Sequence, residues 1–245
     1  MGGGDPGGSI DIVDAAGLST PAFEDLYDNV LVPSFPPDEL LTLEEFRGGN
    51  TGESRTPAFV MVERARPIAA AFGDFDPDSG MLLLAYLATR ADRRSLGLGR
   101  RLLVHALEGW RQLRPAAVLA EIEDPAAHGT SSFGDPVARV RFYHSLGATR
   151  LDLPYCQPAL RPGANRVRGM LLISFAAAGD PAGGVPADRL AAYLRGYLAV
   201  CEGLSDTAAD ADADFGPIFA RLDALAAGPV PESSLLDDPA RQGDP

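Results

Sequence analysis

A turn rich in arginine and glycine is the first stretch whose residue types indicate chemistry. It covers residues 93–101, follows the apolar run 81–88 and precedes a segment with apolar residues at helical spacing that starts near Gly99. In the order strand, glycine turn and helix, backbone N–H groups can converge, and the helix N-terminus adds unpaired donors and the positive end of its dipole. The turn is therefore predicted to hold a phosphate group.

Two carboxylates form a second candidate group. Glu121 and Glu123 lie two residues apart in the run 118–123, so both side chains point to one face of a strand. Two carboxylates buried side by side raise the pKa of one of them, which is a property that a general base needs. The alternative is an exposed strand end whose carboxylates pair with nearby arginines.

The hydrophobic pattern predicts the elements that position these groups. Apolar or alternating runs predict strands at 9–13, 58–62, 68–72, 81–88, 118–123, 148–160 and 167–175. Helical spacing, prolines at the starts and a glycine at one end predict helices at 21–32, 38–46, 99–114 and 136–146. One parallel strand pair with antiparallel strands on either side indicates an α+β layered fold.

Composition divides the chain into four parts. Residues 1–8 are glycine-rich and predicted to be disordered, and 9–178 carry the α+β domain. Residues 179–227 are predicted to be a C-terminal helical extension, with helices at 187–204 and 215–227, and 228–245 a disordered acidic tail. We expect the extension to pack on the core or on a second subunit, which leaves a homodimer open.

The charge balance limits the partners. The net charge is −13, and all 21 basic residues are arginine. This field disfavours nucleic acid and favours a cationic small molecule. The two cysteines and three scattered histidines show no metal-ligand spacing, and no apolar run is long enough to span a membrane, so we expect a cytoplasmic protein without a metal.

Two sequence blocks together resemble a known family. The spacing Arg94-x-x-Gly97-x-Gly99 after an apolar strand resembles the acyl-CoA-binding signature of the GNAT superfamily of N-acyltransferases. Residues 141–148, Arg-Phe-Tyr-His-Ser-Leu-Gly-Ala, are similar to the segment that follows the fifth strand in that superfamily. The resemblance covers roughly residues 10–175. The chain departs from the pattern at Pro136, where many members carry asparagine, and at Ala148, where an aromatic residue often stands.

The resemblance implies a GNAT-like fold with a mixed central sheet of about six to seven strands, in which the parallel fourth and fifth strands splay apart. It also implies acetyl-CoA, or another acyl-CoA, as the cofactor. The pantetheine would bind backbone groups in the fourth strand, and the pyrophosphate would bind the turn. The residues implied for cofactor binding are Leu87, Ala88, Thr89, Arg94, Ser95, Leu96, Gly97, Leu98, Gly99 and Arg100, with Arg93 and Arg101 also available to the phosphates.

The resemblance also implies catalytic roles. Tyr143 stands where the family often keeps a general acid that protonates the leaving thiolate; as an alternative it is a core aromatic of an amphipathic helix. A base is needed for the amine, and Glu123, nearer the strand end, is preferred over Glu121. Acceptor binding is expected from side chains that mix aromatic surface with hydrogen-bonding groups, unless they serve as packing or caps: Phe35, Glu39, Tyr155 and Gln157.

These features predict an N-acetyltransferase that passes an acetyl group from acetyl-CoA to a primary amine of a small cationic molecule by direct attack in a ternary complex. Acetylation of a protein N-terminus or of a lysine is the alternative within the same class. A non-catalytic acyl-CoA-binding module, with the acidic extension as a partner-binding region, is the alternative outside it.

Overall fold

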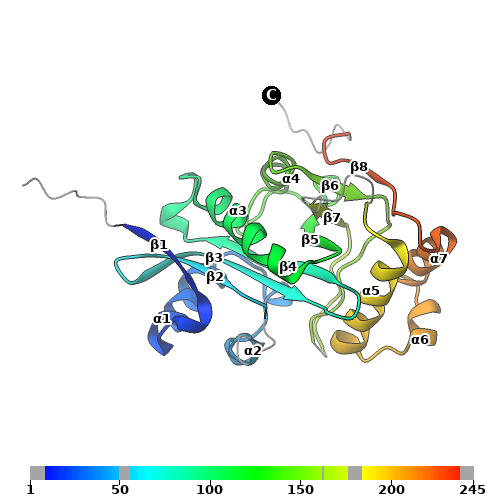
Figure 1. Cartoon of the computed structure of the whole chain (residues 1–245), viewed down its shortest axis with the longest axis horizontal. Coiled ribbons are helices and arrows are strands. Elements are labelled where there is room, and N and C mark those ends of the chain that lie inside the picture. Colours follow the sequence, from blue (N-terminus) through cyan, green and yellow to red (C-terminus); the bar gives the residue numbers. More distant parts are fainter. Residues whose placement is uncertain (1–8, 50–55, 162, 176–183, 238–245) are drawn as a thin grey trace, which may run out of the picture. The chain divides into compact units, whose positions relative to one another are not determined.

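The computed structural model describes residues 9–49, 56–161, 163–175 and 184–237 (Figure 1). The predicted disorder of residues 1–8 lies outside this part of the chain. Two compact units are present. The first contains residues 9–35, 41–73 and 85–112, and the second contains residues 36–40, 74–84 and 113–237.

The strands confirm the predicted mixed α+β architecture. Their order is β1-β2-β3-β4-β5-β7-β6-β8. This is one strand more than the six to seven that were expected. The additional strand, β8 (Glu232–Ser234), comes from the tail that was predicted to be disordered from Gly228 onward.

In the first unit, β1 (Ile10–Asp14) pairs antiparallel with β2 (Phe59–Glu63), which pairs antiparallel with β3 (Arg66–Phe75). The helices of this unit are α1 (Thr20–Leu26), continued by a π-helical turn at Tyr27–Leu31, α2 (Leu43–Gly49) and α3 (Leu98–Trp110). Trp110 fixes α3 because its indole is fully buried and donates to the Pro57 carbonyl at 2.7 Å.

The helix predicted at 38–46 is divided in two. A 3₁₀ turn covers Pro37–Glu39, and α2 begins only after Thr42. Thr42 and Glu45 form a reciprocal cap, in which the Thr42 N–H donates to the Glu45 carboxylate at 2.7 Å and the Glu45 N–H donates to the Thr42 hydroxyl at 3.3 Å. This capping box sets the start of α2 and leaves the 3₁₀ turn as a separate element.

In the second unit, the start of β4 (Met81–Thr89) runs parallel to β5 (Ala117–Glu123). The pairing extends from Met81↔Ala117 to Leu84↔Ala120, and β5 continues beyond it to Glu123. β5 then pairs antiparallel with β7 (Met170–Phe175), β7 with β6 (Ala148–Leu151), and β6 with β8. Ala120, the last residue of β5 that is paired with β4, therefore stands directly before Glu121.

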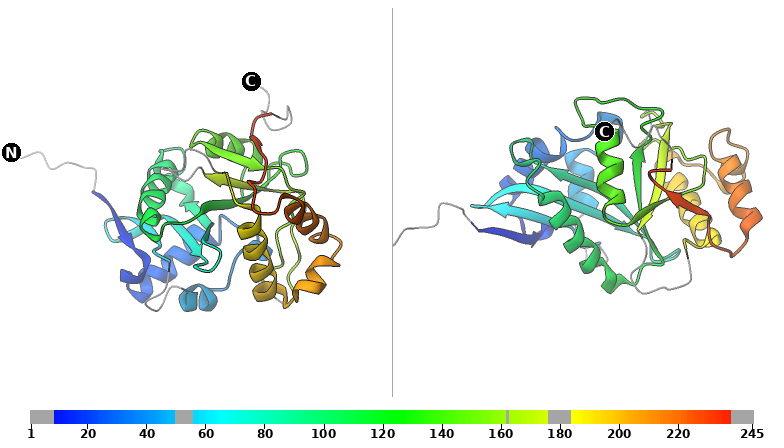
Figure 2. Two further views of the ribbon diagram at one scale, coloured as in Figure 1. Left: turned by 45° about the vertical axis from the view of Figure 1, so that its right-hand side comes forward. Right: turned by 90° about the horizontal axis from the view of Figure 1, so that it is seen from above.

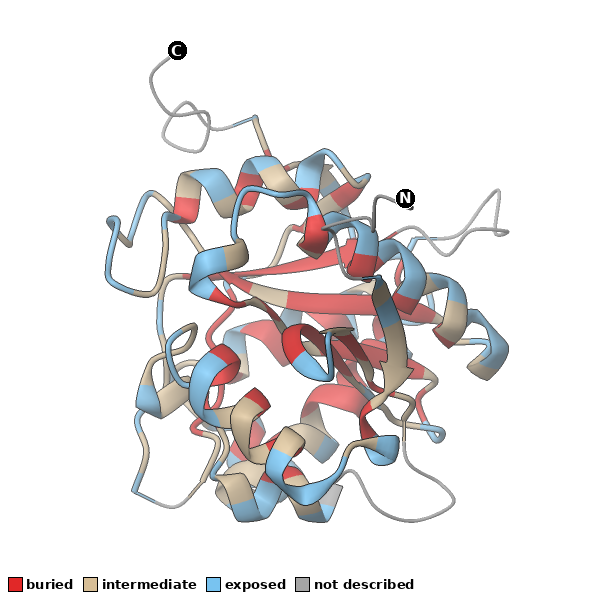
Figure 3. Ribbon diagram, turned by 90° about the vertical axis from the view of Figure 1, so that its left-hand side faces the viewer, coloured by how far each residue is buried: buried red, intermediate tan, exposed pale blue. Residues whose placement is uncertain are grey.

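Helices cover both faces of this part of the sheet. On one face, α5 (Ala187–Glu202) and α7 (Gly216–Leu225) share a hydrophobic core with alternate residues of the strands, among them Leu119 and Leu172. On the other face lies α4 (Pro136–His144), whose Tyr143 contacts Phe175. Figure 2 shows α5, α6 (Asp206–Asp210) and α7 side by side, and Figure 3 shows the buried residues along the strands.

The extension and the start of the tail are thus integral to the second unit. Val230 and Leu235 are buried, and β8 is hydrogen-bonded to β6. The prediction of disorder is wrong for residues 228–237, because pairing with a distant strand orders a segment whose own sequence is polar and short. The rest of the predicted tail, 238–245, lies outside the described residues.

Candidate active site

The predicted phosphate-binding turn has the backbone geometry that such a turn requires. Ser95 and Gly97 both adopt left-handed conformations, with φ of 63° and 73°, and α3 begins at Leu98. The N–H groups of the first helical turn have no partner within the helix. Arg94 to Gly97 are exposed, and the side chain of Leu96 is 65% exposed. The turn therefore presents its backbone to solvent, with Gly99 and Arg100 in the helical turn that follows.

Arg94 connects this turn to the end of β4. Its Nε donates to the Thr89 carbonyl at 3.3 Å, and its Nη2 donates to the Ser34 hydroxyl at 3.3 Å. Leu87 and Thr89 are half-buried, and Ala88 is buried. The turn and the strand that the resemblance assigns to the cofactor are thus joined through one arginine side chain.

Phe35, expected to bind the acceptor, lies in the first unit. Its ring meets the Tyr86 ring edge-on, with centroids 5.1 Å apart, and Tyr86 also packs on Phe46. The structure thus places Phe35 in an aromatic cluster, in agreement with the packing alternative.

The remaining acceptor residues and the carboxylates gather in the second unit, around Glu121. The Tyr155 hydroxyl donates to Glu121 Oε1, and the amide Nε2 of Gln157 donates to Glu121 Oε2 at 2.9 Å. Tyr155 and Gln157 are both buried, and an isolated β-bridge joins Gln157 to Val167. Two residues that were expected to bind the acceptor thus hold Glu121, the second of the two carboxylates considered as the base.

The electrostatics of Glu121 suit proton transfer. Burial raises the pKa of this carboxyl from 4.5 to about 7, against the hydrogen bonds from Tyr155, Gln157 and Tyr197, which lower it; the nearby Glu39 adds a smaller increase. The residue as a whole is half-buried. A carboxyl group that titrates near neutral pH can accept or give a proton.

Glu123 is in a different environment, although it lies on the same face of β5. Its carboxylate accepts from Arg139 Nη1 at 2.6 Å, and the same arginine donates to the Phe133 carbonyl at 3.4 Å. Glu123 therefore forms an ion pair with an arginine, which is the alternative role that the sequence left open for these carboxylates. Its ion pair fixes the loop between β5 and α4.

Glu39 also belongs to the carboxylate group. Burial and the charge of Glu123 raise its pKa. The 3₁₀ turn that carries it is held by Arg161, which donates to the carbonyls of Leu40 at 2.9 Å and Pro37 at 3.0 Å. Three carboxylates from two distant segments thus collect in this unit.

Tyr143, the expected general acid, is buried on the opposite face of the sheet. Its ring meets Phe142 and Phe175 edge-on, with centroids at 5.1 and 5.9 Å. Burial raises the pKa of the phenol to about 12. Phe175 is paired with Val118, whereas Glu121 is paired with Leu172, so the two candidate catalytic side chains belong to alternate faces.

Two tyrosines of α5 were not predicted as site residues. The rings of Tyr193 and Tyr197 stack with centroids 5.8 Å apart and an interplanar angle of 29°. Tyr197 hydrogen-bonds to Glu121, and the charge of Glu121 raises the pKa of Tyr193 further than burial alone does. Their spacing of four residues on a predicted helix was a usable signal, since it places both rings on one face.

Two other kinds of site were sought in the part of the chain that the structure describes. It contains no group of three or more histidine, cysteine, aspartate or glutamate side chains arranged to hold a metal ion. None of its helices combines the length and the apolar character that crossing a membrane requires.

Comparison with known proteins identifies the fold. No protein-family model and no curated protein matches the sequence. Among solved structures, a putative GNAT-family acetyltransferase from Bacteroides thetaiotaomicron is 22% identical, with a TM-score of 0.56 over 78% of this chain and 96% of that chain. The loading GNATL domain of CurA from Lyngbya majuscula is 15% identical, with a TM-score of 0.51 over 70% of this chain and all of that one.

Proposed function

We propose that this chain, which has the GNAT fold, is an acyl-CoA-dependent N-acyltransferase that transfers an acetyl group from acetyl-CoA to a primary amine of a small cationic molecule. The observation that carries the proposal is the environment of Glu121. A carboxyl whose pKa is raised by burial to about 7 is poised to deprotonate an ammonium group at neutral pH.

The turn rich in arginine and glycine would bind the donor. Backbone N–H groups of residues 95–100 would hold the pyrophosphate, since a left-handed turn followed by a helix N-terminus directs several donors at one anion. Arg94 would add a charged hydrogen bond while it keeps Thr89 beside the turn. When bound, the cofactor supplies a thioester whose carbonyl carbon accepts the amine.

The residues around Glu121 would act on the acceptor. Glu121 would take a proton from the ammonium, and the free amine nitrogen would bond to the carbonyl carbon. That nitrogen then loses its second proton to solvent as the carbon–sulfur bond breaks, which leaves a neutral amide and a thiolate. Of the two candidate bases, Glu121 is favoured over Glu123, because Glu123 is occupied by Arg139 at 2.6 Å. Glu121, which the sequence analysis placed second to Glu123, is therefore the preferred base.

Tyr143 would give its proton to the leaving sulfur. Its pKa of about 12 keeps the hydroxyl protonated at neutral pH. Because Tyr143 and Glu121 belong to opposite faces of the sheet, both can serve one thioester only if it lies at the level of the sheet. The parallel pairing of β4 and β5 ends at Leu84 and Ala120, directly before Glu121, which supports such a position.

The chemistry can be tested by following thiol release from acetyl-CoA with a panel of primary alkylamines. Glu121→Gln is expected to lower kcat/KM by about 100-fold or more, as loss of a general base does, while affinity for CoA is kept. Glu123→Gln is the matched control at the neighbouring carboxylate, and its effect is expected to be smaller. Turnover that is unchanged in Glu121→Gln would contradict the assigned base. CoA binding without turnover of any amine would instead favour a non-catalytic module.

A further inference from the structure

Helix α5 presents one face to the candidate base. Tyr193, Tyr197 and Cys201 are spaced four residues apart, so they lie in one row along the helix. Burial and the charge of Glu121 raise the pKa of Tyr193 and the pKa of Cys201. The packing agrees, because Leu119, two residues before Glu121 on the same face of β5, shares a core with Leu190 and Leu194 of α5.

Two buried polar atoms beside Glu121 have no hydrogen-bond partner among the described residues. They are the Gln157 carbonyl Oε1 and the Tyr193 hydroxyl. The side chains belong to residues that are only 8% and 6% exposed. A native fold rarely leaves such buried groups unpaired without a use for them.

The orientation of the Gln157 amide identifies its oxygen as the unpartnered acceptor. Its Nε2 donates to Glu121 at 2.9 Å, and the opposite orientation would place two oxygens against each other. The amide oxygen is therefore fixed next to the carboxylate with its lone pairs available. An oxygen acceptor, a phenol hydroxyl and a carboxylate together match the donors of a primary ammonium group.

We propose that the α5 face of the C-terminal extension forms one wall of the acceptor site, where Tyr193 and the Gln157 carbonyl bind the ammonium group that Glu121 deprotonates. This inference rests on the proposed function and names the acceptor class of the same site. The stacked rings of Tyr193 and Tyr197 add faces on which a cation is stabilised. The amine can donate to Gln157 Oε1 and to the Tyr193 oxygen while its remaining proton goes to Glu121.

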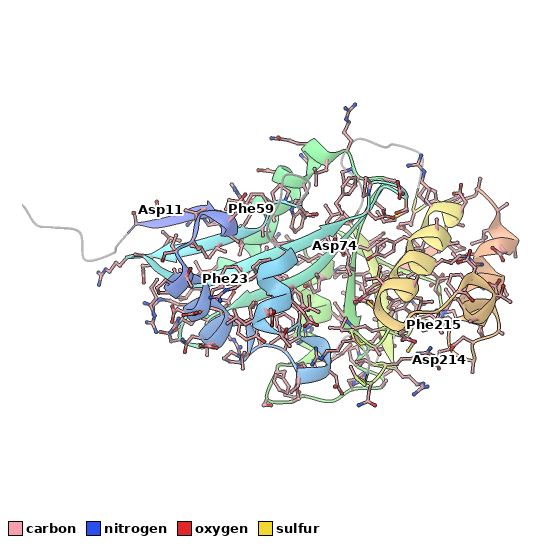
Figure 4. All side chains as sticks on the ribbon, turned by 90° about the horizontal axis from the view of Figure 1, so that it is seen from below. Asp11, Phe23, Phe59, Asp74, Asp214 and Phe215 are labelled. Carbon is pink, nitrogen blue, oxygen red and sulfur yellow. The ribbon has the colours of Figure 1, made fainter. Side chains whose placement is uncertain are left out.

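The contacts at the end of α5 support this role. Glu202 accepts from the Ala159 N–H at 2.9 Å and from Arg166 at 2.7 Å, and Arg166 also binds Asp212 at 2.8 Å. The guanidinium of Arg166 lies 4.8 Å from the ring centre of Phe215, which Figure 4 labels next to Asp214. The extension therefore holds the segment that carries Tyr155 and Gln157, so both walls of the site depend on it.

The test compares two tyrosine variants of the full chain in the thiol-release assay. Tyr193→Phe removes only the unpartnered hydroxyl, so the KM for n-butylamine is expected to rise about tenfold or more, with the KM for acetyl-CoA unchanged. Tyr197→Phe removes a hydrogen bond that lowers the pKa of Glu121, so it is expected to move the pH profile to higher pH. Val200→Ala, at a residue of the same helix that is 86% exposed, is the control and should change neither.

A purely structural role for Tyr193 predicts the opposite result. Removing a buried, unpaired hydroxyl would then leave both KM values unchanged and keep or raise stability. That outcome, with normal turnover in the unaltered protein, would overturn this inference and leave the proposed function in place.

Binding without catalysis separates the two proposals. We expect n-butylamine to raise the melting temperature of the unaltered protein more than n-butanol at the same concentration, and this difference to be lost in Tyr193→Phe. If the shift occurs without any turnover, the amine site stands and the acyltransferase function fails. If neither shift nor turnover is found with any amine of the panel, both fail.

Discussion

The pH dependence of stability in Glu121→Gln gives a test that needs no substrate. Burial raises the pKa of Glu121 from 4.5 to about 7, which means that the folded protein holds this proton more tightly than the unfolded chain does. As pH rises from 4.5 to 7 the unfolded chain loses the proton first, so folding becomes less favourable over this range and then levels off. At roughly 1.4 kcal/mol per pH unit, the loss between pH 5 and pH 8 amounts to about 2.5 kcal/mol.

Glutamine has nearly the same shape and no charge, so the variant should lack this loss. Its amide can accept from Tyr155 and donate to Gln157 after the Gln157 amide turns over, since the oxygen of that amide is unpartnered. Any cost from imperfect hydrogen bonds in the variant is the same at both pH values. The change with pH in the difference between the two proteins therefore reports the raised pKa alone.

Urea unfolding at pH 5 and pH 8 measures this difference. The stability of Glu121→Gln relative to the unaltered protein is expected to be about 2.5 kcal/mol more favourable at pH 8 than at pH 5. Glu108→Gln, an exposed glutamate on α3, is the control, and its difference should stay constant. A relative stability of Glu121→Gln that does not change with pH would show that the carboxyl is solvated, and the argument for a base poised near neutrality would fall with it.

Three further predictions follow from the described contacts. The kcat/KM of the unaltered protein should rise with pH, with a midpoint at about 7. Tyr155→Phe removes a hydrogen bond that lowers the pKa of Glu121, so it should move this midpoint to higher pH. A kcat/KM that stays constant from a pH of about 5.5 to about 8.5 would argue against Glu121 as the base. Gly97→Ala should weaken CoA binding in titration calorimetry and lower stability by about 1 kcal/mol, because φ is 73°, whereas Gly17→Ala, which also adds a methyl group in open space, should do neither. Arg166→Met should cost about 3 kcal/mol in urea unfolding by leaving Glu202 and Asp212 unpaired, and Arg168→Met, at a side chain that is 71% exposed, should cost under about 1 kcal/mol; equal costs would refute the network.

Local features of this chain could be predicted from its sequence. The turn at 94–99 is defined by the residues beside it: an apolar strand before it, glycine at the left-handed position 97, and helical spacing after it. The helical spacing in α3, the proline and glycine at the ends of α4 and the alanine- and leucine-rich composition of α5 likewise indicated helices within a few residues of their observed bounds. Such patterns depend only on neighbours along the chain, so the α+β class and the resemblance to the GNAT superfamily could be predicted from the sequence alone.

The choice of partners needed the tertiary structure. Glu121 and Glu123 have the same residue type on the same face of one strand, and they differ only in what distant segments bring to them: Tyr155 and Gln157 to the first, Arg139 to the second. The polar strand β8 shows no strand pattern and forms by pairing with β6. Helix α5 was predicted as a helix, but only its packing on β5 places Tyr193 and Tyr197 near Glu121. Hydrogen bonds and burial between segments far apart in the chain set the pKa of a carboxyl, and a linear pattern does not contain them.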